Sequence, residues 1–162
     1  MDTDNLVESL VDLVNNFEFS KFMPEISTIL GWIELFTRLC VIAAPIALLF
    51  FGLWYLILPP KEANHIAGYR FYFGMGSVEA WRFTQKLAGI CWTVLGLVLT
   101  IVMVLISNGF RDMDAMDMVY KAVSCILWQI GLIAASCIII NLVLIVRFDA
   151  KGNLRFAKKK RR

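Results

Sequence analysis

The sequence predicts an all-α membrane protein, with three transmembrane helices and an N-terminal amphipathic helix. Of its 162 residues, 59% are hydrophobic and 18% are charged, and the mean hydropathy is +0.70. A soluble domain is closer to half apolar and one quarter charged, so a single globular core could not bury this excess. The apolar residues also form long uninterrupted runs, which are typical of membrane spans. These observations exclude a secreted disulfide scaffold, a disordered tail and an ordinary soluble enzyme.

An acidic head, residues 1–38, precedes the first predicted span. Apolar residues recur in it at helical spacing, which predicts an amphipathic helix over residues 4–16. Pro24 interrupts this pattern, and a second helix is expected to begin just after it and to run directly into the first span. In that helix, Glu34 and Arg38 have the spacing of an ion pair. We expect the head to lie outside the cell, where it packs across the end of the bundle or binds a partner.

Three runs without a charged residue follow the head: residues 39–58, 87–106 and 123–146. A helix rises about 1.5 Å per residue, so each run can cross the roughly 30 Å hydrocarbon core of a bilayer. Lipid offers no hydrogen-bond partners to an open strand, so each run is expected to be a helix. Pro45 lies within the first run and is expected to kink it.

The distribution of basic residues predicts the orientation of the chain. With the head outside, loop 59–86 and the basic cytoplasmic tail, residues 147–162, together carry 12 Lys and Arg residues, and the exterior segments carry 4. The positive-inside rule selects this arrangement, with the N-terminus outside and the C-terminus inside. In the tail, Lys151-Gly152-Asn153 is a turn signal that predicts a small hairpin. The bases at 158–162 are expected to attract anionic lipid.

Small residues recur along two of the predicted spans. Their spacing places them on one helix face, and they are Gly89, Thr93, Gly96 and Thr100 in the second span, and Ser124, Gly131 and Ala135 in the third. Small residues let membrane helices approach closely. We therefore expect these faces to pack within the bundle, with oligomer formation or a ligand groove as the alternatives.

Chemically reactive side chains are sparse in the predicted spans. Gln129 and Asn141 are the notable polar residues, and no Asp, Glu, Lys, Arg or His lies within any span. Proton relays, ion pumps and intramembrane proteases generally need such groups, so neither an enzyme nor a catalytic residue is predicted. The four cysteines lie far in sequence from the only histidine, His65, so we expect packing roles and no metal or cofactor. A bridge between Cys40 and Cys125 is the alternative.

The loop between the first two spans has the most distinctive sequence. The two prolines at 59–60 are expected to stop the first helix. Ser77 can cap the next helix, and Glu79 would lie in its first turn, where the helix dipole favours an acid. Arg70 could pair with Glu62 or Glu79, or bind a lipid phosphate. These residues either brace a turn between two helices or form a docking surface for a cytoplasmic protein or a lipid.

An ordered set of residues here resembles the signature of the SdpI family of small bacterial membrane proteins. The matching residues are Asn64, Gly68, Tyr69, Arg70, Ser77, Glu79, Ala80 and Trp81, followed by Gln85, Lys86 and Gly89. The resemblance covers about residues 40–146, which make up nearly all of the predicted three-span module, residues 39–146, and it excludes the head. After Arg70 the sequence departs from the family, whose members commonly continue with Thr-Pro, whereas this chain has Phe71-Tyr72. The founding member is also longer, with additional spans.

The resemblance implies a multi-pass protein of the bacterial cytoplasmic membrane, of the immunity or receptor type, that protects the cell from an antimicrobial peptide. It also implies signalling by partner sequestration, since the founding member is associated with holding a transcriptional repressor at the membrane. The acidic head would suit a cationic peptide toxin. A structural or accessory subunit of a larger membrane complex is the second hypothesis, and a membrane enzyme or transporter is the third.

The expected partners are the lipid bilayer, a cationic peptide outside and a cytoplasmic protein inside, without direct binding of nucleic acid. Trp81 is expected to anchor at the lipid headgroups. The candidate contacts to a partner or a lipid are Asn64, Gly68, Tyr69, Arg70, Ser77, Glu79 and Trp81.

Overall fold

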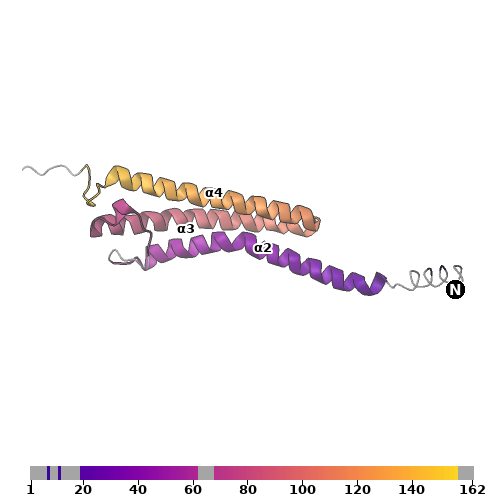
Figure 1. Cartoon of the computed structure of the whole chain (residues 1–162). Helices are drawn as coiled ribbons and strands as arrows, with labels where there is room; N and C mark the ends of the chain where they lie inside the picture. The colour runs from indigo at the N-terminus through magenta and orange to yellow at the C-terminus, as the bar shows by residue number, and fades with distance from the viewer. Residues whose placement is uncertain (1–6, 8–10, 12–18, 62–67, 157–162) are drawn as a thin grey trace, which may run out of the picture.

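Three long helices lie side by side in the computed structural model, which describes residues 7, 11, 19–61 and 68–156 (Figure 1). Their bounds are α2, Phe19–Ile57; α3, Val78–Asn108; and α4, Ala115–Arg147. Two short 3₁₀ helices, η1 (Tyr72–Gly74) and η2 (Gly109–Asp112), lie before and after α3. Figure 1 shows α2 extending past the turn that joins α3 to α4. We call the end where α2 stops and α3 begins the loop end, and the end with the α3–α4 turn the turn end.

Each of the three helices is long and apolar enough to cross a membrane. The most apolar stretches of α2, α3 and α4 have mean hydropathies of 2.3, 2.6 and 2.5. Many large apolar side chains point away from the bundle, as they do in a protein whose surface faces lipid. The predicted fold class is confirmed for the three spans, each of which begins before the charge-free run in the sequence. Apart from Val7 and Val11, the amphipathic helix predicted over 4–16 lies outside the described residues.

The first helix differs from the prediction at its start. α2 begins at Phe19 and continues through Pro24, whereas the sequence predicted a new helix just after the proline. Pro24 lies in the early turns of α2, where its missing N–H costs a single backbone hydrogen bond. The predicted ion pair is present, with 2.6 Å between Nη2 of Arg38 and Oε1 of Glu34. Figure 1 also shows α2 bending along its length, as expected for a helix that contains Pro45.

Small residues bring α2 and α3 into close contact. A Cβ atom on Gly96 would collide with the backbone of Leu49, and one on Gly52 would collide with the backbone of Thr93. The packing role predicted for the small residues of the second span is therefore confirmed at this interface. The prediction for the third span is wrong within the bundle, because Ser124, Gly131 and Ala135 have exposed positions on α4. Their spacing is helical, but that face of α4 is turned away from α2 and α3.

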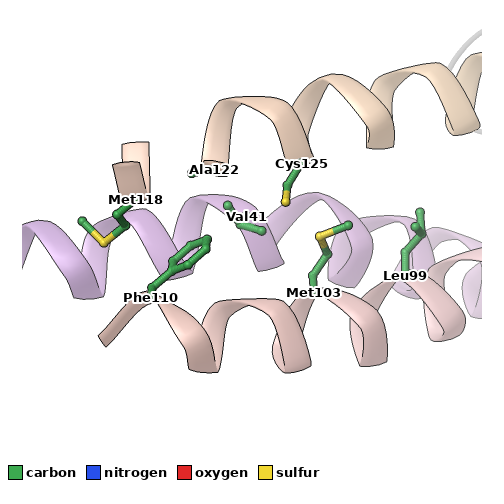
Figure 2. Close-up of a cluster of buried hydrophobic side chains, with 7 residues drawn as sticks. All are labelled: Val41, Leu99, Met103, Phe110, Met118, Ala122 and Cys125. Carbon is green, nitrogen blue, oxygen red and sulfur yellow. The ribbon is translucent and has the colours of Figure 1, made fainter. Parts of the chain in front are cut away.

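A buried apolar cluster joins all three helices in the half of the bundle nearer the turn end (Figure 2). Its members are Val41, Leu99, Met103, Phe110, Met118, Ala122 and Cys125. All four cysteines are free, including Cys40, so the alternative of a disulfide to Cys125 is wrong. The cluster contains no hydrogen-bonding side chain apart from the thiol of Cys125.

One buried polar contact repairs the backbone at Pro45. The Nε2 atom of Gln129, on α4, donates a 3.0 Å hydrogen bond to the carbonyl oxygen of Val41. In an uninterrupted helix that carbonyl would accept from the residue four positions later, which here is Pro45 and has no N–H. Prolines in membrane helices are tolerated where a neighbouring helix supplies the missing partner. Gln129 therefore supplies the hydrogen bond that the Val41 carbonyl of α2 lacks, and it fixes the register of α4 against α2.

Candidate functional site

The start of α3 is built as its sequence predicted. The helix begins at Val78, and the Oγ atom of Ser77 accepts a 3.1 Å hydrogen bond from the backbone N–H of Ala80. Glu79 lies in the first turn with an exposed side chain. α2 ends at Ile57, directly before the prolines at 59–60. Local signals in the sequence therefore determined both helix boundaries at the loop end.

Trp81 connects these two boundaries. Its side chain is fully buried (0% exposed), and its indole Nε1 donates a 2.8 Å hydrogen bond to the carbonyl oxygen of Pro60. The expectation that Trp81 anchors at the lipid headgroups is therefore wrong. The chain around Gly68 covers the indole, so Trp81 binds the loop and not the membrane surface.

Gln85 holds the backbone of Tyr69 with two hydrogen bonds. Its Oε1 accepts from the Tyr69 N–H at 2.8 Å, and its Nε2 donates to the Tyr69 carbonyl at 2.9 Å. The preceding residue, Gly68, has φ +110°, and a Cβ atom there would lie 2.8 Å from the ring of Trp81. Only glycine fits both that backbone conformation and that space. Gly68, Tyr69, Trp81 and Gln85 therefore form one unit, which we call the loop clamp.

Tyr69 extends the loop clamp to α4. Its hydroxyl donates a 2.8 Å hydrogen bond to Oδ1 of Asn141, and its ring meets the ring of Trp92 edge-on at 5.4 Å. Burial is the main reason why the pKa of Tyr69 is raised above its ordinary value, so the phenol keeps its proton and remains a donor. A single loop residue thus contacts both α3 and α4.

A second connection joins the start of α3 to the chain after α4. Phe148 and Leu154 form an antiparallel bridge around Gly152, which has φ +74°, and we call residues 148–155 the tail hairpin. Ser77 Oγ donates a 2.8 Å hydrogen bond to the Gly152 carbonyl, so the side chain that caps α3 also binds this turn. The small hairpin predicted from Lys151-Gly152-Asn153 is confirmed. Its contact with Ser77 could not be seen in the sequence.

Asp149 stabilises the turn of the tail hairpin. Its carboxylate accepts hydrogen bonds from the backbone N–H groups of Asn153 at 2.7 Å and Lys151 at 2.9 Å. These bonds, led by the one from Asn153, hold the pKa of Asp149 below its ordinary value. The carboxylate is therefore charged at neutral pH and engaged within its own turn.

The predicted site residues fall into three groups. Gly68, Tyr69, Ser77 and Trp81 are brought together in and beside the loop clamp. Arg70 and Glu79 have exposed side chains on the outside of it. Asn64 lies outside the described residues, as does Glu62, the other acid considered for pairing with Arg70.

Three contributors were not among the predicted site residues, although the sequence analysis names each in another role: Gln85 in the family signature, Asn141 as a polar residue of the third span, and Gly152 in the turn signal. Gln85 and Asn141 are amides within or beside apolar runs, where a polar side chain needs a partner. That signal could have identified them as network members, although it does not reveal which groups they bind. The network has no nucleophile paired with a base, and its hydrogen bonds fix the shape of the loop.

A separate pocket lies at the turn end. It has a volume of about 330 Å³ and lies between the first half of α2 and the turn joining α3 to α4. Phe110 and Met118 form part of its apolar wall, and Glu34, Asp114 and Arg111 supply charge. Glu34 is paired with Arg38, as described above. Asp114 precedes α4 as its N-cap residue and makes no side-chain capping hydrogen bond.

Comparison with protein families identifies the module that carries the loop clamp. The family model described as the SdpI/YfhL protein family matches residues 61–146, from just after the loop prolines almost to the end of α4. The match begins later than the resemblance over residues 40–146, so α2 lies outside it. Comparisons with curated proteins and with solved structures give no significant match. The match covers more than half of the chain and includes every residue of the loop clamp. With three membrane-spanning helices and this signature, the chain belongs to the SdpI/YfhL protein family.

Proposed function

We propose that this protein is a non-enzymatic membrane receptor of the immunity type, which protects a bacterial cell from a cationic antimicrobial peptide. Family membership and the three spans support the general class. The finer assignment rests on the pocket at the turn end, which the positive-inside distribution assigns to the outside. In that orientation, the loop end and the tail hairpin face the cytoplasm.

The observation that carries this proposal is the composition of the pocket at the turn end. Apolar side chains such as Phe110 and Met118 line it together with the acids Glu34 and Asp114 and the base Arg111. Glu34 is paired with Arg38, so Asp114 is the carboxylate that the pocket offers to a basic side chain of a ligand. Antimicrobial peptides of the cationic class combine an apolar face with basic side chains. An apolar wall beside carboxylates matches both parts of such a ligand.

Long-range electrostatics favours the same ligand. Residues 1–38 contain seven acids and two bases, which gives a net charge of −5. A concentration of one charge raises the rate at which an oppositely charged molecule arrives. The attraction should weaken as salt shortens the screening length, which is about 10 Å at 0.1 M.

Peptide challenge of cells tests the proposal. Cells that express the protein are compared with cells that lack it against a panel of cationic peptides, and survival is measured. We expect Asp114→Asn to reduce protection, because it removes a carboxylate of the pocket that makes no capping bond. Glu79→Gln is the matched control, since it removes an exposed acid at the loop end. Equal protection by all three chains, or no protection by any, would contradict the proposal.

The orientation is tested separately by cysteine labelling. A thiol reagent that does not cross membranes is applied to intact cells carrying Asp114→Cys or Asn153→Cys, and the unmodified chain measures the background from its four cysteines. The positive-inside distribution predicts labelling at position 114 and none at position 153 until the cells are opened. Labelling of position 153 in intact cells would reverse the orientation and remove the pocket from the exterior.

A second candidate function is a structural or accessory subunit of a larger membrane complex. The observation that favours it is the outward face of α4, where Ser124, Gly131 and Ala135 are exposed. Small residues facing lipid leave room for another helix. Co-purification of a second membrane protein that is lost on Gly131→Leu, with peptide protection unaffected or absent, would favour this function over the first.

A further inference from the structure

An apolar groove runs beside the last turns of α4. It has a volume of about 620 Å³ and is lined by side chains of α4 and of the segment after it: Leu142, Val143, Val146, Arg147, Leu154 and Phe156. Because α4 spans the membrane and the groove lies at its end, the groove is at the depth where lipid chains meet their headgroups. Five of its six lining residues are apolar, and the sixth is Arg147 at the end of the helix.

Basic side chains gather at this end of the groove. Arg147 and Arg155 are cross-strand neighbours at the base of the tail hairpin, joined by a 3.0 Å backbone hydrogen bond from Arg155 N–H to the Arg147 carbonyl. The Cζ atom of Arg147 lies over the ring of Phe83, 4.1 Å from the ring centroid. The Nε atom of Arg155 donates a 2.9 Å hydrogen bond to the Phe148 carbonyl, which holds this side chain at the base of the tail hairpin. A guanidinium carries five N–H donors, so each of these contacts leaves donors for an anion.

Asp149 lies in the same hairpin, and its carboxylate interacts electrostatically with Arg155 without forming an ion pair. The Asp149 carboxylate accepts its hydrogen bonds from Lys151 and Asn153 within the turn. Among the described residues, no carboxylate forms an ion pair with Arg147 or Arg155. The end of the groove is therefore positively charged, beside an apolar channel on a membrane-spanning helix.

We propose that this groove binds one anionic phospholipid, with an acyl chain along α4 and the phosphate on Arg147 and Arg155. The apolar lining selects a lipid over a free phosphate ion, because an inorganic anion would gain nothing from Val143, Val146 and Phe156. The two guanidinium groups select an anionic headgroup over a neutral one. This site does not depend on the proposed receptor function, which concerns the opposite end of the bundle.

The test is native mass spectrometry of the detergent-purified full chain, titrated with phosphatidylglycerol or with phosphatidylcholine. We expect one phosphatidylglycerol to bind in preference to phosphatidylcholine, and inorganic phosphate not to displace it. Arg147→Gln and Arg155→Gln should each weaken phosphatidylglycerol binding about five-fold, the loss expected for one base at a membrane surface. Val146→Trp should fill the groove and weaken the binding of both lipids.

Matched controls separate the site from general attraction to lipid. Lys121→Gln removes an exposed base, and Ile130→Trp enlarges an exposed apolar residue, both on α4 but outside the groove. Neither control should change the binding. Neutralising the five bases at 158–162 should lower the affinity for phosphatidylglycerol, and Val146→Trp should weaken binding by the same factor in that background. Thermal unfolding checks that the Val146→Trp variant is folded.

Three results would overturn the proposal. The first is equal binding of the two lipids by the unmodified chain. The second is lipid binding that is unchanged in Val146→Trp and Arg147→Gln. The third is a groove occupied by a second copy of the chain, which would appear as a dimer that Val146→Trp dissociates while lipid binding stays the same.

Discussion

At the loop end, directional hydrogen bonds join the helices, whereas the buried cluster toward the turn end is held by apolar contacts. Trp81 binds Pro60, and Gln85 binds both backbone groups of Tyr69. The apolar cluster toward the turn end consists of residues such as Met103 and Phe110, whose contacts do not depend on the direction of a hydrogen bond. In a bilayer, apolar contact distinguishes poorly between protein and lipid, so polar pairs and close packing set the register of helices. The hydrogen bonds of the loop clamp and of Gln129 therefore set the register of the helices, and the apolar cluster has the looser geometric requirement.

The largest expected effect is at Trp81. Trp81→Ala removes a fully buried indole from beneath Gly68 and deletes the bond to Pro60. We expect a loss of about 3–5 kcal/mol in the free energy of unfolding, as for other large core truncations. Thermal unfolding in detergent measures the loss. Trp81→Phe keeps most of the volume and should retain most of the stability, and equal losses in both variants would mean that the hydrogen bond, and not the packing, is decisive.

The contrast between the loop clamp and the apolar cluster is tested by one substitution in each, both to leucine. Gln85→Leu leaves the N–H and the carbonyl of Tyr69 without partners, and should cost on the order of 3 kcal/mol. Met103→Leu, in the apolar cluster, should cost less than about 1.5 kcal/mol. Chemical unfolding of both variants provides the comparison. If Met103→Leu proves as costly as Gln85→Leu, the two clusters are equally demanding and the distinction drawn above is wrong.

A smaller effect is expected at Gln129, which makes a single hydrogen bond. Gln129→Leu should cost about 1 kcal/mol, because it leaves the carbonyl of Val41 unsatisfied. A double-mutant cycle sharpens this prediction. In a Pro45→Ala background, the N–H of the new alanine can bond Val41, so Gln129→Leu should cost less there than in the unmodified chain. Additive losses would show that Gln129 does not compensate for the proline.

The smallest effect is a pH dependence of the tail hairpin. The pKa of Asp149 is lower in the folded chain than its ordinary value of 3.8, so the folded state favours the charged carboxylate. The stabilisation is complete at pH values above the unfolded pKa, and it is lost as the pH falls through the folded pKa. The protection of the Lys151 and Asn153 amides, measured as the exchange rate relative to the unfolded chain at the same pH, should therefore fall below about pH 4. Asp149→Asn should exchange faster already at neutral pH and lose this pH dependence, and an unchanged profile would contradict the assignment.

Local signals in the sequence predicted much of the fold, but they could not predict which side chains make contact across the bundle. The charge-free runs predicted three helices, and Ser77 predicted the first turn of α3, because both depend on neighbours in sequence. Which groups Trp81 and Gln85 bind depends on the path of the loop, and this path requires the positive φ of Gly68. Sequence periodicity also could not tell which face of α4 meets α2, so the exposure of Gly131 was missed.

The bond between Ser77 and Gly152 has a consequence for biosynthesis. The two residues are 75 positions apart, and Tyr69 and its partner Asn141 are separated by 72. A ribosome adds about 5–20 residues per second, so Asn141 and Gly152 are synthesised several seconds after the residues of the loop end that bind them. During this time α2 and α3 can already pair through Gly52 and Gly96, which need no later segment. Membrane insertion would then start as a two-helix intermediate, and synthesis of the tail hairpin would complete the loop end.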